Sequence, residues 1–312
     1  MTLTWNGRRF DWVNVVYFAW IHAMALLAFW TFTWTGLAVL LLLWWVSGSL
    51  GIGVTYHRLL THRGFKMAKP LEYLGTFFGM LASEGGAITW VAMHRVHHAQ
   101  SDRPGKDMHT PKDGFFWSHF GWIICKTDMG HRQMESRYAP ELMADPVHRV
   151  LNRLHVFPNI LVGLALFAWG GWPLVIWGMF LRLVIVLNTT WFVNSATHTW
   201  GYRTFQTPED SRNLWWVGLL AWGEGWHNNH HAFQRSARHG LAWWELDANW
   251  MAIRALRALG LVRDVQLLPR NAERFRIGGR ETTVLEGPLA AIEPVASVYE
   301  PSPSAYGPAV ST

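Results

Sequence analysis

Two long stretches of the chain carry almost no charge. No Asp, Glu, Lys or Arg occurs from Trp12 to Tyr56, and Arg182 is the only such residue from Leu154 to Gly201. A helix that crosses a bilayer needs about 20 apolar residues, so each stretch is long enough for two helices joined by a tight turn. The sequence therefore predicts an all-α integral membrane protein with four transmembrane helices in two hairpins.

The composition supports this interpretation. Charged residues make up 15% of the chain, whereas a soluble domain has roughly 25%. The first apolar stretch runs too long for a signal peptide and lacks a small-residue cleavage site after a short core. The formal net charge is +6, but the basic residues flank the apolar stretches, so we expect no nucleic-acid partner. The single cysteine, Cys125, excludes an intramolecular disulfide and a cysteine-ligated iron–sulfur cluster.

Basic residues also predict the orientation in the membrane. Neither expected turn, at Thr31–Gly36 and at 170–173, carries Lys or Arg, while the segments before, between and after the hairpins do. Because cytoplasmic loops are enriched in Lys and Arg, we expect both termini and all long loops on the cytoplasmic side. Arg182 interrupts the fourth expected span, and its long side chain is expected to snorkel towards the outer face.

Two further segments are expected to form helices that do not cross the membrane. Leu71–Ala82 is apolar but short and contains Glu72, which indicates a partly buried or interfacial helix. Trp243–Leu259 has apolar residues at helical spacing and a stop at Gly260, which is typical of an amphipathic helix on the membrane surface. The tail from Glu286 is rich in Pro, Ala and Ser and is predicted to be disordered.

The chain contains sixteen histidines, and nine of them are grouped near the ends of the expected helices. Residues at i, i+3 and i+4 share one face of a helix, so each His-x-x-His-His motif is expected to present three imidazoles in one direction. Residues five apart point to different sides of an ideal helix, so we expect the helix to end between His57 and His62, as Gly64 suggests. The nine are His57 and His62; His94, His97 and His98; His198; and His227, His230 and His231.

Three clusters and a ninth histidine on one side of the membrane indicate two metal ions. Imidazole suits iron, zinc and copper, and the spacing alone does not choose among them. A ligand imidazole usually donates its other N–H to an acceptor. We therefore consider four acidic residues as acceptors of these N–H groups. Two further histidines could contact the metal-binding histidines without binding a metal themselves. We expect the remaining five histidines to be packed in the core or solvated. The acceptors are Glu72, Glu84, Asp107 and Glu224, the partners are His109 and His119, and the others are His22, His131, His148, His155 and His239.

Several metal chemistries are disfavoured. The His-Glu-x-x-His motif of zinc hydrolases is absent from the sequence. A bis-histidine haem protein would pair histidines across spans inside the bilayer, and a transporter would place polar ligands near the bilayer midplane. Here the histidines gather at span ends. Histidine-ligated iron beside an apolar channel instead indicates oxygen activation and attack on an unactivated C–H bond.

Five segments resemble those of the membrane fatty-acid desaturases, specifically the Δ9 group of stearoyl-CoA desaturase and the bacterial and cyanobacterial acyl-lipid desaturases. They cover most of the chain from about Gly48 to Trp250, and the last is more similar to the acyl-lipid branch. We therefore expect a desaturase domain at 1–285 and a separate tail at 286–312. The segments are HRLLTH (57–62), HRVHHAQSD (94–102), GFFWSHFGW (114–122), LRLVIVLNTTWFVNSATHTWGYR (181–203) and GEGWHNNHHAFQRSARHG (223–240).

The resemblance implies a di-iron centre in a cytoplasmic helical cap over four transmembrane helices. Its two Fe²⁺ ions would be bound by the nine histidines, with Asn194 reaching one iron through a water. Two electrons and O₂ would introduce a double bond into a fatty acyl chain, and the cis-Δ9 position rests on the resemblance alone. The alternative is a histidine-box hydroxylase or ketolase acting on an alkane, sterol or carotenoid, and only the product separates the two.

The residues also suggest where the acyl chain binds. Small side chains around Ser49 leave room in the second span, and Trp45 could close the far end of a tunnel. Trp90, Thr190 and Trp191 match family positions at the bend of the substrate channel, next to the metals. Close helix packing and an interfacial aromatic belt are alternative explanations of these residues. Whether the acyl group is carried by a lipid, by CoA or by a carrier protein stays open.

The electrons are expected to come from another protein. The sequence has no flavin or nicotinamide fingerprint and no His-Pro-Gly-Gly haem motif. A separate donor such as a ferredoxin or cytochrome b5 would supply them, attracted by cytoplasmic Lys and Arg residues. The expected partners are thus this donor, the acyl substrate and membrane lipid.

Overall fold

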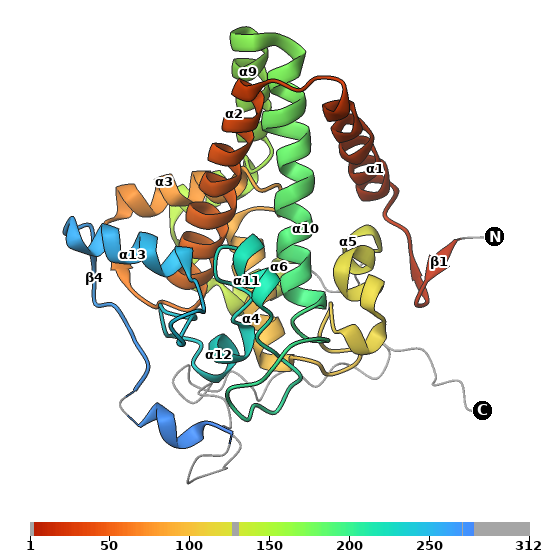
Figure 1. Ribbon diagram of the computed structural model, residues 1–312. Coiled ribbons are helices and arrows are strands. Elements are labelled where there is room, and N and C mark those ends of the chain that lie inside the picture. The colour runs from red at the N-terminus through yellow and green to blue at the C-terminus, as the bar shows by residue number, and fades with distance from the viewer. Residues whose placement is uncertain (1–2, 127–130, 270, 278–312) are drawn as a thin grey trace.

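The computed structural model describes residues 3–126, 131–269 and 271–277, and this part of the chain is mostly helical. Three helical segments are long and apolar enough to cross a membrane: Trp12–Phe29, Trp34–Thr61 and Phe157–Ser195. Figure 1 shows the long helices rising to one end of the molecule, with shorter helices and loops gathered at the other. The prediction of a membrane protein is confirmed. The predicted tail at 286–312 lies outside the described residues.

The first two long segments begin at side chains that cap helices. α1 (Trp12–Leu26) follows Asp11, whose carboxylate accepts hydrogen bonds from two backbone amides of the first turn, and it runs into a 3-10 turn, η1 (Leu27–Phe29). α2 (Trp34–Trp44) follows Thr33, whose hydroxyl also accepts a backbone N–H. Such caps satisfy donors that a helix start leaves unpaired. The predicted first turn lies between these two helices.

α2 continues without a break as η2 (Trp45–Thr61), whose backbone follows the wider π-helical pattern. The N–H of His62 donates to the carbonyl of His57 at 3.1 Å, and the hydroxyl of Thr61 donates to Tyr56 O at 2.8 Å. In this i→i+5 pattern, residues five apart lie on the same face. The His57 and His62 rings are accordingly 4.8 Å apart. η2 ends at Thr61 and His62 is its cap, so the expectation that the helix ends between these two histidines is confirmed, and the wider turn brings their rings together.

The second apolar stretch folds back on itself. α9 (Phe157–Val175) is followed by η5 (Ile176–Leu181) and α10 (Arg182–Ser195), but its backbone is not helical at Gly170 (φ −149°, ψ 19°) and Gly171 (φ 66°, ψ −157°). A residue with a side chain rarely adopts the conformation of Gly171. α9 packs against η5, and Figure 1 shows α9 and α10 joined at the top. The chain therefore turns where the Gly-Gly sequence predicts.

Arg182 is buried in the bundle, so the expectation that it snorkels is wrong. The residue is 1% exposed. Its guanidinium donates to the carbonyl of Leu81, which follows α3 (Lys69–Met80), and to Asn159 Oδ1 at 2.7 Å. A helix end leaves carbonyls unpaired and carries partial negative charge, which a cation offsets. Arg182 thus joins α10 to the end of α3 and to α9.

The two expected surface helices are present, with one different boundary. α3 confirms the helix predicted at Leu71–Ala82. The segment predicted at Trp243–Leu259 is helical only as α13 (Ala248–Ala258). The start is later because the Asp247 side chain accepts a backbone N–H of the first turn and so caps the helix.

Shorter elements form the lower part of the molecule in Figure 1. The helices are α4 (Ala87–Gln100), η3 (Pro111–Asp113), η4 (Trp117–Gly121), α5 (Trp122–Ile124), α6 (His131–Tyr138), α7 (Pro140–Ala144), α8 (Pro146–Arg153), α11 (Trp215–Leu220), α12 (His227–Ala232) and η6 (Ala272–Phe275). Two antiparallel ladders complete the fold: β1 (Thr4–Trp5) pairs with β2 (Arg8–Arg9), and β3 (Lys66–Met67) pairs with β4 (Val262–Arg263).

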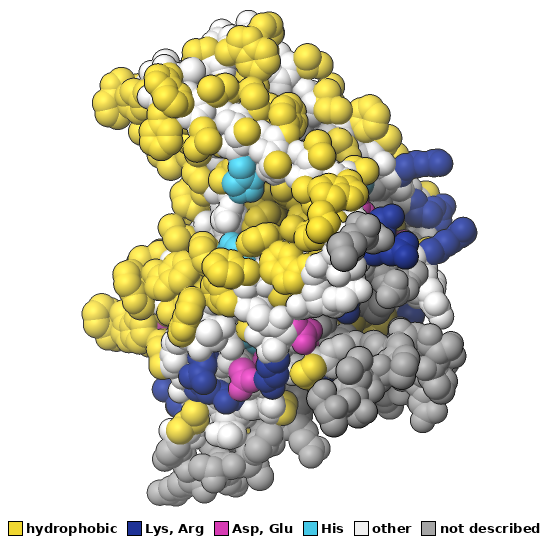
Figure 2. All heavy atoms as spheres, turned by 90° about the vertical axis from the view of Figure 1, so that its right-hand side faces the viewer, with side chains coloured by type: hydrophobic (Ala, Val, Ile, Leu, Met, Phe, Trp, Pro, Cys, Tyr) yellow, Lys and Arg dark blue, Asp and Glu magenta, His cyan; other side chains and the backbone are white. Residues whose placement is uncertain are grey.

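The surface of the long helices is apolar. Figure 2 shows hydrophobic side chains over the upper part of the molecule, whereas Lys and Arg gather lower down. Val13, Phe29, Trp34 and Leu164 are each more than half exposed. A continuous exposed apolar surface of this kind is suited to lipid rather than to water. The lower part carries the charged groups and, as described next, the histidines.

Candidate metal centre

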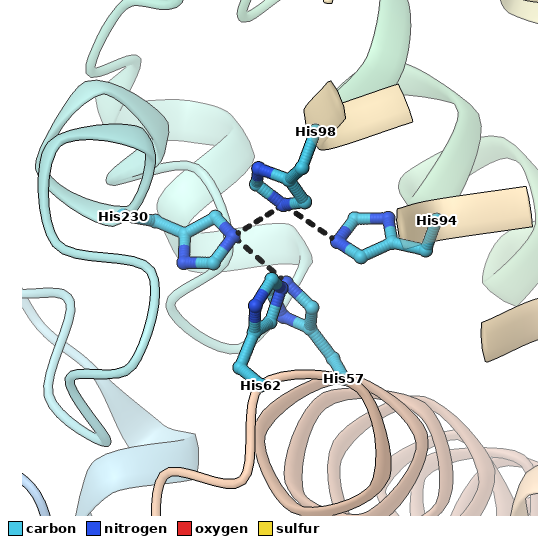
Figure 3. A group of neighbouring side chains, drawn as sticks. All are labelled: His57, His62, His94, His98 and His230. Atoms are coloured by element: carbon cyan, nitrogen blue, oxygen red, sulfur yellow. Dashed lines mark hydrogen bonds between the residues drawn. The ribbon is translucent and has the colours of Figure 1, made fainter. Parts of the chain in front are cut away.

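The nine grouped histidines converge in two buried sets. Group A contains five histidines and group B contains four, and the ligand nitrogens within each group lie within 4.8 Å of one another. Figure 3 shows group A, with the five rings pointing toward one another. Group A is His57 and His62 of η2 and its end, His94 and His98 of α4, and His230 of α12; group B is His97 of α4, His198 after α10, and His227 and His231 of α12.

Each His-x-x-His-His motif is divided between the two groups, contrary to the expectation that its three imidazoles point in one direction. In α4, His94 and His98 point into group A and His97 into group B. On a helix, residues four apart point in nearly the same direction, whereas neighbours diverge by about 100°. The i, i+4 pair therefore stays together and the third histidine turns to the other group. α12 does the same in reverse: its i, i+4 pair enters group B and His230 enters group A.

The spacing of ring nitrogens fits metal coordination. In group A, Nε2 of His230 lies 3.0 Å from Nε2 of His57 and 3.0 Å from Nε2 of His98. In group B, Nε2 of His227 lies 3.1 Å from that of His198 and 3.0 Å from that of His231. Two nitrogens about 3 Å apart, each bonded to one metal at about 2.1 Å, would make an angle of roughly 90° at that metal.

Several buried nitrogens of these histidines lack a hydrogen-bond partner among the described residues, two of them at Nε2. Nε2 of His62 and Nε2 of His97 are buried and have no hydrogen-bond partner among the described residues. A buried polar atom without a partner is costly, so such an atom indicates a missing ion or water. The donor set, made of buried imidazoles, therefore fits a transition metal in each group.

Burial keeps these imidazoles neutral. Burial, followed by the charges of neighbouring histidines, holds the pKa of His94, His98 and His230 well below the usual value for histidine. The same causes lower the pKa of His62 and His227. A neutral imidazole offers a lone pair, whereas a protonated one cannot bind a metal. These five imidazoles thus present lone pairs near neutral pH.

Carboxylates behind group B orient its histidines. Nδ1 of His97 lies 3.0 Å from Asp107 Oδ2, and Nδ1 of His198 lies 2.8 Å from Asp102 Oδ2. Burial opposes ionisation of these acids, but His97 and His198 hold the pKa of Asp107 and Asp102 well below the usual range. Each carboxylate thus accepts the Nδ1–H and leaves Nε2 facing the metal position. The prediction of Asp107 as an acceptor is confirmed.

Sequence reasoning missed the other acceptors of group B. Asp102 ends the HRVHHAQSD segment, so its place beside the second cluster was a usable signal. Glu209 Oε1 lies 3.5 Å from Nδ1 of His231, and no local motif marks it. Burial by itself would raise the pKa of Glu209, but the neighbouring His231 holds that pKa well below the usual range.

Group A is supported by a buried ion-pair network. Nδ1 of His57 lies 2.7 Å from Glu224 Oε2, which confirms Glu224 as an acceptor. Arg58 pairs with Glu224 at 3.0 Å and with Asp247 at 2.9 Å. His239, expected to be merely packed, has Nδ1 3.2 Å from Glu224 and a ring 4.5 Å from that of His230. Apart from Glu224, the sequence analysis did not point to this network, because Arg58 and Asp247 lie far apart in the chain and meet only in the folded protein.

The remaining histidines and acids have other partners. His148 Nε2 lies 2.9 Å from Glu72, and Trp90 Nε1 donates to Glu84 at 2.9 Å, so neither acid supports one of the nine histidines. His109 stacks on His97 with ring centroids 4.4 Å apart, which fits an outer partner. His119 instead contacts Ser195 and Asn188.

A cavity of about 750 Å³ reaches group A. Its wall includes His94 together with Trp90, Thr190, Trp191 and Asn194, so three predicted substrate residues and the predicted water-mediated ligand lie on it. The Trp90 ring stacks on that of His94, with centroids 4.9 Å apart. Ligand pockets commonly enclose about 300–1,000 Å³. The cavity is thus of a size to bind a small-molecule substrate beside the histidines.

The other two predicted substrate residues lie away from the described wall of this cavity. Ser49 is buried and donates to Asn249 Oδ1 at 2.6 Å, which fastens α13 to η2. Trp45 is 38% exposed on the apolar surface. Their roles in substrate binding stay predictions.

Glu84 places an unusual acid in the cavity wall. Burial raises the pKa of its carboxyl to about 7, although hydrogen bonds from Trp90 and Thr190 oppose the shift. The group is therefore only partly ionised at neutral pH and largely neutral below it, and in its neutral form it can donate as well as accept a hydrogen bond.

Comparison with known proteins agrees with this geometry. The sequence model of the fatty acid desaturase family matches residues 30–265. The sn-1 stearoyl-lipid 9-desaturase of Anabaena variabilis is 48% identical over 261 residues, which cover 83% of this chain and 95% of the relative. The sn-1 stearoyl-lipid 9-desaturase of Synechocystis sp. is 45% identical, covering 84% and 82%, and the sn-2 palmitoyl-lipid 9-desaturase of Nostoc sp. is 44% identical, covering 85% and 93%.

The chain belongs to the fatty acid desaturase family. It is an oxidoreductase that introduces a double bond into a fatty acyl chain, as the resemblance of its histidine motifs predicts.

Proposed function

We propose that the chain forms a cis-Δ9 double bond in a lipid-linked fatty acyl chain, at two iron ions held by groups A and B. The observation that carries this proposal is the pair of buried histidine groups beside a cavity whose wall contains His94 and Asn194. The three relatives described above are all named for lipid-linked acyl chains and for position 9. They differ in chain length and glycerol position, so we propose neither for this chain.

The residues present have distinct tasks in this proposal. The nine histidines hold the metals, with Asn194 acting through a water, and the carboxylates behind them fix the imidazole tautomers. When bound, iron supplies the oxidising power that O₂ and two electrons make available for attack on C–H bonds. The cavity wall holds the acyl chain with one pair of carbons beside His94, so the position of the double bond follows from how the chain is seated.

We further propose that the long helices cross the membrane four times. The break at Gly170–Gly171 divides the 39-residue segment Phe157–Ser195 into two arms that fold back on each other, and the longer arm, from Trp172 to Ser195, is of sufficient length to span a bilayer by itself. The basic residues lie at the end of the molecule that contains the histidines, which supports a cytoplasmic helical cap and both termini on that side. Labelling of single introduced cysteines in intact cells tests this orientation.

The proposed reaction is tested in a bacterial host that lacks its own desaturase. Wild type and a His97→Ala, His98→Ala variant, which removes one ligand from each group, are expressed to the same level with an electron donor. Double-bond positions are then determined in the intact lipids and in the acyl-CoA pool. Wild type is expected to produce cis-Δ9 chains in lipids, and the variant none. A hydroxylated product would contradict the proposal. So would a double bond that appears in the acyl-CoA pool before it appears in the lipids.

Trp45 offers a separate test of chain length. If this side chain closes the far end of the acyl tunnel, Trp45→Ala shifts the product profile towards longer chains. An unchanged profile would show that Trp45 only covers the apolar surface, where it is partly exposed.

A further inference from the structure

The turn between α4 and η3 connects group B with the protein surface. Asp102 and Asp107 are both 3% exposed, whereas the four residues between them, 103–106, are all exposed. The turn is closed by hydrogen bonds from the N–H groups of Lys106 and Asp107 to the carbonyl of Arg103, each at 3.0 Å. It therefore presents two carboxylates inwards and two cationic side chains outwards.

Both carboxylates of this turn contact histidines of group B. Asp107 Oδ2 lies 3.0 Å from His97 Nδ1, and Asp102 Oδ2 lies 2.8 Å from His198 Nδ1. The N–H of Asp102 also donates to Asp107 Oδ2 at 3.0 Å. A short path of covalent and hydrogen bonds thus runs from Arg103 and Lys106 to two imidazoles on different elements.

Group A also has an exposed cation beside one of its ligands. Arg63 follows His62, but its guanidinium is paired with Glu141 at 2.8 Å. The side chains that support His57, which are Arg58, Glu224, His239 and Asp247, are between 1% and 7% exposed. The turn beside group B differs because its exposed cations, Arg103 and Lys106, form no ion pair among the described residues.

The proposed reaction consumes two electrons, which a carrier protein could deliver at such a surface. Arg103 and Lys106 give the turn positive charge, and Lys112 nearby pairs with Asp210 at 3.1 Å, both half exposed. Complementary charge steers a partner to its binding surface and fixes its orientation. A cationic turn selects a partner with an acidic face.

We propose that the turn Asp102–Asp107 is the docking surface for an acidic one-electron carrier protein, which delivers electrons to group B through Asp107–His97 and Asp102–His198. This inference rests on the proposed function. Each carrier is oxidised by one electron, so two dockings serve one double bond. O₂ takes these two electrons and two protons from solvent, together with two hydrogen atoms from the acyl chain, and leaves as two waters.

The test measures binding of an oxidised, acidic plant-type [2Fe–2S] ferredoxin to the detergent-solubilised enzyme, by surface plasmon resonance at low and high ionic strength. Lys106→Glu is compared with Arg263→Glu, which makes the same charge change at an exposed position on β4. At low ionic strength Lys106→Glu is expected to weaken binding roughly tenfold, and Arg263→Glu to have little effect. Added salt is expected to remove the difference.

A second measurement separates docking from chemistry. With dithionite as the reductant, Lys106→Glu is expected to form product at the wild-type rate, whereas the ferredoxin-driven rate falls. If Lys106→Glu bound ferredoxin as tightly as wild type does, the proposed docking surface would be wrong. It would also be wrong if Lys106→Glu and Arg263→Glu lost the same amount of ferredoxin affinity. Absence of product from wild type with either reductant would overturn the proposed function, and the binding comparison would still decide where the ferredoxin docks.

Discussion

Groups A and B contain the same ligand chemistry but are supported in different ways. Behind group A lies a buried ion-pair network that joins Arg58, Glu224 and Asp247. Behind group B lie carboxylates whose neighbours in the chain reach the surface, as at the turn Asp102–Asp107. Group A is thus supported by buried charges that pair with one another beside the cavity, whereas group B is supported by carboxylates at the two ends of an exposed turn. Variants at the two groups should therefore fail in different ways.

The largest effect is expected at the core of group A. Arg58→Met leaves Glu224 and Asp247 buried without their cation, and removing one partner of a buried pair costs about 3–5 kcal/mol. The midpoint of thermal unfolding in detergent should fall sharply. Lys112→Met is the matched variant near group B, and its half-exposed pair with Asp210 should cost at most about 1 kcal/mol. If the midpoint of thermal unfolding fell equally in the two variants, the expected difference between the supports of groups A and B would be contradicted.

The next effect concerns metal retention. Glu224→Gln removes the carboxylate charge behind His57 in group A, and Asp107→Asn removes that behind His97 in group B. Loss of an outer partner typically lowers metal affinity about 10–100-fold. Iron per chain is measured by mass spectrometry after dialysis against a chelator, and each variant should lose one of two metals. Loss of both metals from either variant would show that the groups bind cooperatively.

A smaller effect concerns the pH response of the cavity. Burial raises the pKa of Glu84 to about 7, so its charge appears in the apolar wall as the pH rises through that value. His94, His98, His227 and His230 have lowered pKa values and do not titrate there. The wild-type KM should rise by up to about tenfold between about pH 6 and about pH 8. Glu84→Gln should show a flat profile; a profile unchanged from wild type would place the titrating group elsewhere.

The smallest effect is expected on the helix that carries His57. Ser49→Ala removes the hydrogen bond to Asn249 and should lower the free energy of unfolding by about 0.5–1.5 kcal/mol. Chemical denaturation in detergent measures it. The acyl-chain profile of the same variant tests the separate prediction that Ser49 contacts the substrate, and an unchanged profile would contradict that prediction.

The sequence by itself determined the membrane class, the histidine motifs and the family. These features depend on short-range patterns: charge-free stretches of span length, a Gly-Gly break, and histidines at helical spacing. The same patterns located α3, although α13 began later than its apolar spacing suggested, because the Asp247 side chain caps the helix at that point.

Only the tertiary structure decided how the histidines are shared and what supports them. The π-helical turn that aligns His57 with His62 differs from an α-helix by one residue per hydrogen bond, which spacing does not reveal. Asp102 meets His198 across 96 positions, and Arg58 meets Glu224 across 166. Arg182 likewise finds its partners on two other helices. Such contacts depend on how helices pack, because buried polar groups take the partners that packing brings within reach.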